Sequence, residues 1–309
     1  MSQSTIFVFP GQGSQQVGML AELAADNPVI QETFAQASKV LGYDLWALVQ
    51  EGPSDALNQT DKTQPALLCA SVALWRLWLQ KGGAEPAVMA GHSLGEYSAL
   101  VCAGALDFDD AIDLVRLRGE YMQQAVPAGT GAMAAILGLA DELVEAACAE
   151  AAEGDVVAAV NYNCPGQVVI AGEKAAVARA MLSAKEKGAK RAIELPVSVP
   201  SHCELMRPAA LKLAQKLESI TLQMPNIAVI QNVSAAQPES VAQIKENLIA
   251  QLYSPVLWTN SMRAAIALSD EVAIECGAGK VLSGLNKKIH KPLLVASLAD
   301  LAGWEKVSS

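Results

Sequence analysis

Short apolar runs alternate with stretches of helical periodicity in the first part of the chain. Ile6–Phe9 and Val88–Ala90 are uninterrupted apolar runs, which indicate strands buried on both faces. Apolar residues at helical spacing predict helices at Pro28–Leu41, at Thr63–Gln80, near Glu96–Ala103 and at Asp109–Gln124. This alternation is typical of a mostly parallel sheet with helices on both faces.

A different order of elements begins after the loop Pro127–Gly131. The pattern predicts strand, helix, strand, strand, helix and strand at Ala132–Leu137, Asp141–Ala152, Val156–Asn161, Gln167–Ala171, Lys174–Lys187 and Ala189–Leu195. This βαββαβ order is that of a ferredoxin-like unit, an antiparallel sheet with both helices on one side.

Beyond Pro196 the first kind of pattern resumes. Helices are predicted near His202–Ser219, Glu239–Leu252, Thr259–Leu268 and Gly279–Ile289, and strands at Glu271–Glu275 and Leu293–Ala296. We therefore predict an α/β fold in two parts. Residues 1–128 and 197–309 form a large domain around a mostly parallel sheet, and residues 129–196 form an inserted ferredoxin-like subdomain.

The composition is that of a folded chain of 309 residues, 52% of them hydrophobic and 17% charged. The most apolar stretches, such as Pro65–Leu79 and Gly131–Leu139, are short or interrupted by charge, whereas a membrane span needs about 20 apolar residues. The N-terminus lacks the basic segment of a secretion signal. We expect no transmembrane helix and a cytoplasmic location.

Charge and cysteine content exclude further classes of protein. A net charge of −10 argues against binding to nucleic acid or to an anionic membrane, because both need a basic face. The six cysteines are scattered without a Cys-x-x-Cys pair, so neither a disulfide framework nor a zinc site is predicted.

The candidate nucleophile is Ser93 in Gly91-His-Ser-Leu-Gly95, which follows a predicted strand and precedes a predicted helix. That context is required of a G-x-S-x-G nucleophile elbow, in which flanking glycines permit a sharp turn that exposes the hydroxyl. The helix start behind it offers free N–H groups to an oxyanion, and Leu94 would supply one. The alternative is an ordinary turn in which Ser93 is only the N-cap.

A serine nucleophile needs a base, and the chain has three histidines. His92 adjoins the serine on the sharp turn and should point elsewhere, and His290 lies in a basic, surface-like stretch. His202 remains, and Ser201 with Glu204 resembles a capping box that would place His202 at the first position of a helix. A helix N-terminus disfavours the charged ring, so His202 would be neutral and able to accept a proton. The alternative is a capping-region histidine without a catalytic task.

Two arginines of one predicted helix differ in their neighbours. Arg116 has Asp113 and Glu120 at helical spacing, which indicates a solvated ion-pair face. Arg118 has only apolar or aromatic residues at the same offsets and therefore needs an anion from elsewhere. Either a distant acidic side chain or the carboxylate of a ligand could provide it, and a guanidinium binds a carboxylate with two parallel hydrogen bonds.

The first turn, Pro10-Gly-Gln-Gly-Ser-Gln15, lacks the third glycine of a nucleotide-binding loop. In an open α/β sheet it should lie near the elbow, where the Gln12 amide could be a second oxyanion donor. The alternative is a plain tight turn.

Taken together, these motifs resemble the malonyl-CoA:acyl carrier protein transacylases of bacterial type II fatty acid synthesis. The blocks that carry the resemblance occur in the family's order and span nearly the whole chain: Phe9–Gln15, Gly91–Leu100, Arg116–Gly119, Pro165–Gly172, Val197–His202 and Gln251–Pro255. The resemblance implies an α/β-hydrolase-like large domain with an inserted ferredoxin-like subdomain.

The resemblance also implies roles for six residues. Ser93 would be the nucleophile and His202 its base, the amides of Gln12 and Leu94 would form the oxyanion hole, and Arg118 would hold the free carboxylate of malonyl. The main-chain carbonyl of Gln251 would accept a hydrogen bond from His202, which makes a dyad rather than an acid-completed triad.

The implied reaction moves malonyl from malonyl-CoA to the phosphopantetheine thiol of acyl carrier protein through a malonyl-serine, in ping-pong order. It needs neither a metal nor another cofactor, and we expect a monomer. The carrier protein of this family is acidic, so we predict a basic docking patch, with two candidate clusters: Lys185, Lys187, Lys190 and Arg191, or Lys287, Lys288 and Lys291. Two other functions stay open, a serine esterase or thioesterase on the same pair and a non-catalytic acyl-CoA-binding subunit.

Overall fold

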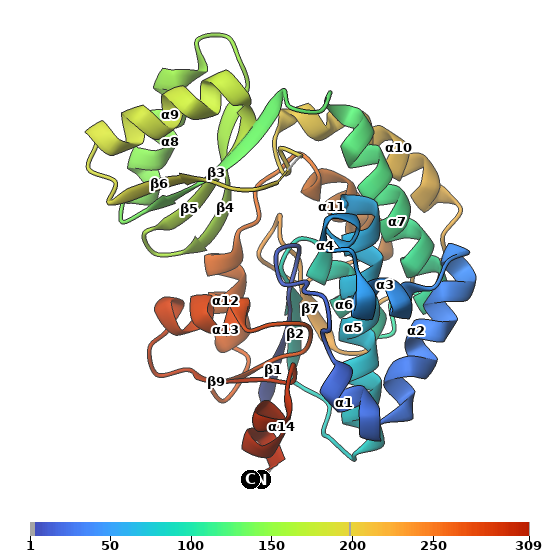
Figure 1. Cartoon of the computed structure of the whole chain (residues 1–309). Helices are drawn as coiled ribbons and strands as arrows, with labels where there is room; N and C mark the ends of the chain where they lie inside the picture. Colours follow the sequence, from blue (N-terminus) through green and yellow to red (C-terminus); the bar gives the residue numbers. More distant parts are fainter. Residues whose placement is uncertain (1–3, 198, 309) are drawn as a thin grey trace.

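A computed structural model of the chain describes residues 4–197 and 199–308, and their strands form two separate sheets (Figure 1). The larger sheet has the order β7-β2-β1-β8-β9, and its neighbouring strands all pair in parallel. Its strands are β1 (Thr5–Phe9), β2 (Val88–Gly91), β7 (Ala228–Ile230), β8 (Val272–Glu275) and β9 (Leu294–Ser297). The predicted α/β class, with a parallel sheet and a separate antiparallel one, is confirmed.

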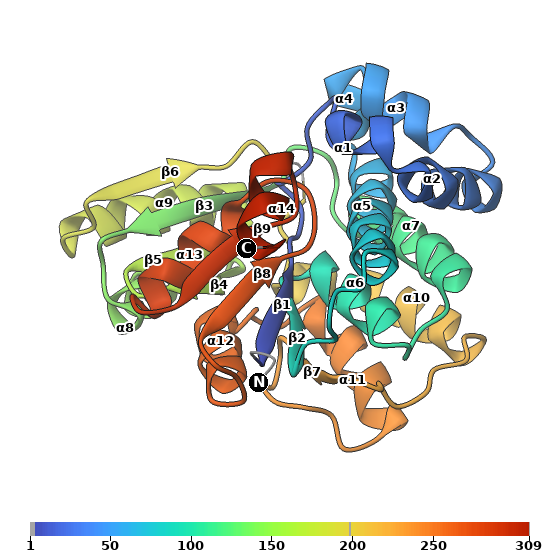
Figure 2. The ribbon, with the colours of Figure 1, turned by 90° about the horizontal axis from the view of Figure 1, so that it is seen from below.

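Alternate side chains of β1 enter two different apolar cores, as the two-residue period of a strand requires. Phe7 and Phe9 pack into the core on the side of α5 (Thr60–Gln80), α6 (Leu94–Cys102) and α7 (Phe108–Ala125). Ile6 and Val8 pack on the other side, against α12 (Trp258–Ile266) and α13 (Val281–Ile289). The sheet is therefore covered on both faces, which Figure 2 shows from below.

The remaining helices of the larger part surround this core. They are α1 (Ala21–Asp26), α2 (Pro28–Leu41), α3 (Leu45–Glu51), α4 (Ser54–Leu57), α10 (Arg207–Glu218), α11 (Val241–Gln251) and α14 (Leu301–Ser308). The sequence patterns did not predict β7, α1, α3, α4 or α14. Each has eight residues or fewer, so at most about two turns of a helix or three residues of a strand carry the pattern.

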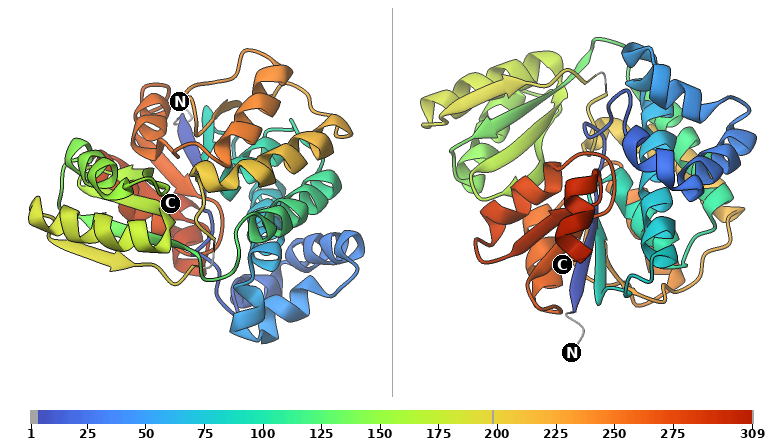
Figure 3. Two further views of the ribbon diagram at one scale, coloured as in Figure 1. Left: turned by 90° about the horizontal axis from the view of Figure 1, so that it is seen from above. Right: turned by 60° about the horizontal axis from the view of Figure 1, so that its bottom comes forward.

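The second sheet is antiparallel, with the order β4-β5-β3-β6 (Figure 3). Its chain segment runs β3 (Gly131–Leu137), α8 (Asp141–Ala152), β4 (Val157–Cys164), β5 (Gln167–Glu173), α9 (Lys174–Glu186) and β6 (Arg191–Glu194). The helices α8 and α9 pack on one face, while Met133, Val169 and Ala171 on the other face pack with Cys203 of the larger part. The subdomain boundaries at 129 and 196 stay a prediction.

The segment at His202 differs from its prediction. His202 has φ +67°, which a helix does not accommodate, and α10 begins only at Arg207 after a short 3₁₀ turn at Glu204–Met206. The capping box is wrong because the Glu204 carboxylate pairs with Arg207, and the Ser201 amide, which that carboxylate would have accepted, donates to the carbonyl of Val199. The His202 amide donates to the carbonyl of Leu252. His202 therefore lies in a turn that is tied to the end of α11.

Candidate active site

Ser93 occupies a strained turn between β2 and α6. Its φ of 52° and ψ of −109° lie outside the regions that L-residues ordinarily adopt. A Cβ on Gly91 would lie 1.9 Å from the main chain of Gly95, and a Cβ on Gly95 would lie 2.0 Å from the carbonyl oxygen of Phe9. Both glycines are therefore required by close backbone contact, as the elbow motif predicts.

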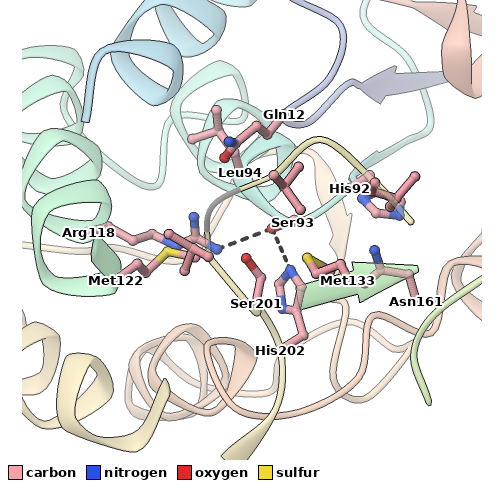
Figure 4. Close-up of a pocket in the computed structure, with 13 residues that line it drawn as sticks. Gln12, His92, Ser93, Leu94, Arg118, Met122, Met133, Asn161, Ser201 and His202 are labelled. Atoms are coloured by element: carbon pink, nitrogen blue, oxygen red, sulfur yellow. Dashed lines mark hydrogen bonds between the residues drawn. The ribbon is translucent and has the colours of Figure 1, made fainter. Parts of the chain in front are cut away.

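The Ser93 hydroxyl faces a cavity rather than the helix behind it. Ser93 is at the N-cap position of α6, but its side chain makes no capping hydrogen bond. Its Oγ lies 2.8 Å from Nε2 of His202, a residue 109 positions away in the chain (Figure 4). The N-cap interpretation thus does not account for the hydroxyl.

The second ring nitrogen of His202 determines the direction of this hydrogen bond. Nδ1 lies 2.7 Å from the main-chain carbonyl oxygen of Gln251, which can only accept. Nδ1 therefore carries the proton, and Nε2 is left to accept from the Ser93 hydroxyl. Burial lowers the pKa of His202 to about 3, with a further contribution from the charge of Arg118 and an opposing one from the Gln251 hydrogen bond. The ring is neutral at neutral pH because of burial and Arg118, not because of a helix N-terminus.

Arg118 is almost completely buried, with 1% of its surface exposed. It donates to Gln64 Oε1 at 2.8 Å, to Gln251 Oε1 at 3.0 Å and to Ser93 Oγ at 3.2 Å, while its Nε has no partner. Among the described residues, no ion pair within 4.0 Å includes Arg118. The groups that accept hydrogen bonds from Arg118 are all neutral. The guanidinium of Arg118 is therefore a buried cation that lines the cavity beside Ser93.

Arg116 and the two other histidines have partners of their own away from Ser93. Arg116 pairs with Asp113 and Glu120 at 2.6 Å each, so its prediction is confirmed. His92 lines the same cavity, but its Nε2 is 2.8 Å from Asn163 Oδ1 and not directed at Ser93. His290 is partly exposed and contacts Glu271 at 3.0 Å.

Gln12 and Leu94 line the cavity on the side of Ser93 away from His202 (Figure 4). Within residues 4–197 and 199–308, neither of their amides donates a hydrogen bond to another group. Leu94 is the first residue of α6, where amides have no partner within the helix. Both amides therefore remain available to a group in the cavity, and their role as oxyanion donors stays a prediction.

Two polar residues of the site were missed by the sequence analysis. The Asn232 side chain accepts from the Ser93 amide at 2.7 Å and donates to the Gly91 carbonyl at 2.6 Å, which fastens both sides of the elbow. Glu96 is fully buried in α6, and Asn232 and Gln251 both donate to it. Asn232 follows the unpredicted strand β7, so no pattern pointed to it. Glu96 could have been noticed in the sequence, because it is the one carboxylate in an otherwise largely apolar helix.

The cavity has a volume of about 110 Å³ and lies between the two parts of the molecule. Ser93, Arg118 and Met122 come from the larger part, whereas Met133 and Asn161 come from the subdomain. Because about 10–15 Å³ of such space holds one water molecule, the cavity has room for several water-sized groups, enough for a short acyl chain. Three or more ligating side chains of the kind that bind a metal do not cluster anywhere in the described part of the chain.

Comparison with known proteins identifies the family. The profile of the acyl transferase domain family matches residues 6–303. The malonyl CoA-acyl carrier protein transacylase of Escherichia coli K12 is 60% identical over 294 residues, 95% of this chain and 95% of that protein. An acyl carrier protein S-malonyltransferase of Vibrio cholerae is 60% identical with a TM-score of 0.96, over 98% of this chain and 99% of that chain. A malonyl-transacylase solved in complex with its type II PKS acyl-carrier protein is 55% identical with a TM-score of 0.97, over 98% of both chains.

The parallel sheet, the serine on its sharp turn and the family match define the chain as an acyltransferase. The resemblance noted in the sequence is confirmed by relatives that share more than half of its residues over nearly the whole length. The chain belongs to the malonyl-CoA:acyl carrier protein transacylase family.

Proposed function

We propose that this chain transfers the malonyl group of malonyl-CoA to the phosphopantetheine thiol of acyl carrier protein, in fatty acid synthesis. The observation that carries the proposal is the joint placement of His202 and an unpaired, buried Arg118 on the Ser93 hydroxyl. His202 can remove the serine proton, and Arg118 can hold the carboxylate that distinguishes malonyl from acetyl and other uncharged short acyl groups. The names of the close relatives, malonyl CoA-acyl carrier protein transacylases, point to the same substrates.

The first half-reaction acylates the enzyme. The Ser93 hydroxyl attacks the thioester carbonyl carbon of malonyl-CoA while its proton passes to Nε2 of His202. The tetrahedral intermediate collapses with cleavage of the C–S bond, and CoA leaves as a thiol with that proton. The amides of Gln12 and Leu94 stabilise the intermediate oxygen, and removing one such donor typically costs about 2.7–4 kcal/mol.

The second half-reaction returns the enzyme to its starting state. The carrier-protein thiol gives its proton to His202 and attacks the malonyl-serine ester, and the Ser93 oxygen takes the proton back as it leaves. The hydrogen bond between His202 Nδ1 and the Gln251 carbonyl holds the ring in the required tautomer and stabilises its charged form in both steps.

Both half-reactions balance with groups of this chain and the two substrates, so the proposal includes no cofactor. One chain completes the site, which supports a monomer as the active unit. All six cysteines are free and buried, which fits a reducing compartment, and we include a cytoplasmic location in the proposal. The described part of the chain has no helix that is long and apolar enough to cross a membrane.

The decisive experiment follows the malonyl group. The purified protein is incubated with malonyl-CoA and examined by intact-protein mass spectrometry, with Ser93→Ala as control. We expect a malonyl adduct on wild type only, and quantitative transfer of malonyl when holo acyl carrier protein is added. Release of free malonate in place of malonylated carrier protein would instead establish a thioesterase. A protein that binds malonyl-CoA without forming an adduct would be a non-catalytic subunit.

A further inference from the structure

Glu96 is a buried carboxylate that the proposed mechanism does not use. It lies one turn after the nucleophile on α6, and none of its surface is exposed. Three N–H groups donate to it: the Asn232 amide at 2.7 Å, Gln231 Nε2 at 3.0 Å and Gln251 Nε2 at 3.1 Å. Burial raises the pKa of Glu96 to about 7 against the opposing effect of these three donors, so the carboxylate is ionised at pH 8. Asn232 and Gln251 both belong to the site.

The side chain of Gln251 joins Glu96 to Arg118. Its Nε2 donates to Glu96 and, at 3.1 Å, to the carbonyl of Ser93, and its Oε1 accepts from Arg118 Nη2 at 3.0 Å. An amide has one donor end and one acceptor end, so the end that faces Glu96 determines the end that faces Arg118. If the amide were reversed, its NH₂ group would meet the N–H groups of the guanidinium, and Arg118 would have to move.

We propose that Glu96 is a positioning residue that fixes the Gln251 side-chain amide and thereby holds Arg118 ready for an acyl carboxylate. The inference rests on the proposed function and deepens it: Glu96 contributes to the preference for malonyl without touching the substrate. Gln251 Nε2 donates to three oxygens, those of Glu96, the Ser93 carbonyl and the Asn232 side chain. Of these acceptors only Glu96 carries a charge, and a charged acceptor forms the stronger hydrogen bond.

Charge and position must be separated in the test, because a negative charge near Arg118 also repels an incoming carboxylate. Glu96→Asp keeps the charge but shortens the side chain by one methylene, so it cannot reach all three donors. Gln251→Met keeps the charge at Glu96 and the main-chain carbonyl that His202 uses, and removes the side-chain amide with its hydrogen bonds to Arg118, Glu96, the Ser93 carbonyl and Asn232. Glu275→Asp is the matched control, because Glu275 is equally buried and bonded to Leu282 and Ser283 at the start of α13, away from the cavity.

The readout is the ratio of kcat/KM for acylation of Ser93 by malonyl-CoA to that by acetyl-CoA, measured on the full chain at pH 8. Both substrates need the elbow, His202 and the Arg118 hydrogen bond to Ser93, but only malonyl has a carboxylate for Arg118 to bind. We expect the ratio to fall about tenfold or more in Glu96→Asp and in Gln251→Met, the usual effect of losing a hydrogen bond to a charged group. The double variant should lie within about twofold of Gln251→Met, because both changes act through one bridge. Glu275→Asp should keep the wild-type ratio.

An unchanged ratio in Glu96→Asp, or a fully additive double variant, overturns the inference while leaving the proposed function intact. Absence of any malonyl adduct on wild type overturns the proposed function instead. Glu96→Met, which keeps the length of the side chain but has no carboxylate oxygen, provides a second measurement should Glu96→Asp not fold. Its crystal structure should show Arg118 displaced from Gln251 Oε1, and an unmoved Arg118 with an unmoved Gln251 amide contradicts the inference.

Discussion

Arg118 donates a hydrogen bond through Nη2 to the hydroxyl oxygen of Ser93, at 3.2 Å. The same oxygen lies 2.8 Å from His202 Nε2, so the nucleophile is held between a cation and a base. A carboxylate that binds Arg118 must therefore lie close to the carbon that Ser93 attacks. Malonyl, whose two carboxyl carbons are separated by one methylene, fits this arrangement.

The first prediction concerns Arg118. Replacing it with alanine removes the partner of the malonyl carboxylate. We expect the transition state for malonyl-CoA to lose about 1.5–3 kcal/mol or more of stabilisation, so that kcat/KM falls at least about tenfold. The rate with acetyl-CoA should change much less. Arg118→Lys should recover little, because an ammonium cannot form the paired hydrogen bonds of a guanidinium. Equal losses with both acyl-CoA substrates would contradict a role in carboxylate recognition.

The second prediction concerns pH. Because burial and Arg118 lower the pKa of His202 from 6.5 to about 3, the ring stays neutral as the pH falls through 6. The rate of Ser93 modification by an uncharged fluorophosphonate should thus be nearly constant from pH 7 to about pH 5. With a base of ordinary histidine pKa, the rate would fall tenfold for each pH unit below about 6.5. In Arg118→Ala the repelling charge is absent, so the acid limb should move to higher pH. An inflection near 6.5 in the wild type would show that His202 is not held neutral.

The third prediction concerns the elbow glycines. In Gly95→Ala the new Cβ would lie 2.0 Å from the Phe9 carbonyl oxygen, so β1 and α6 must separate. We expect the free energy of unfolding to fall by about 3 kcal/mol or more, measured by urea denaturation. Gly284→Ala is the control, because that Cβ on α13 would meet no atom within 4 Å and should stabilise the helix by about 0.5–1 kcal/mol. Equal unfolding midpoints for the two variants would refute the close-contact argument.

The fourth prediction concerns the docking of carrier protein. Of the two basic clusters, the one at Lys187 is partly neutralised by Glu150 at 2.7 Å, while Lys288 reaches Gln167 of the subdomain at 3.2 Å. We therefore expect charge reversal of Lys287, Lys288 and Lys291 to raise the KM for carrier protein about tenfold at low salt, with acylation by malonyl-CoA little changed. Reversal of Lys185, Lys190 and Arg191 is the comparison. Unchanged KM values in both variants would exclude a basic docking patch.

Much of the architecture was predictable because it is encoded locally. Pro28–Leu41 and Asp141–Ala152 form helices with the predicted bounds, since each carries its apolar face at helical spacing. The βαββαβ order was legible for the same reason. Ser93 stood out because glycines at 91 and 95 are needed wherever a chain turns this sharply beside another backbone.

The surroundings of Ser93 were decided by tertiary structure. Local pattern placed His202 at the start of a helix, but the carbonyl of Leu252 and the pairing of Glu204 with Arg207 hold it in a left-handed turn. Arg118 could be identified as lacking a local partner, yet the alternative of a distant acidic partner was resolved only by packing. The side chains that surround it are Gln64, Gln251 and Ser93.

The sequence by itself determined most of the longer strands and helices, where the sharp turn lies and which arginine is out of place on its helix. These properties depend on neighbours a few residues apart. The tertiary structure alone decided that Ser93, His202, Arg118 and Gln251 meet at one cavity, and that Glu96 and Asn232 support them. The contacts of Ser93 with His202, of Arg118 with Gln251 and of Glu96 with Asn232 join positions more than a hundred residues apart. Their energy depends on packing and burial that no local pattern contains.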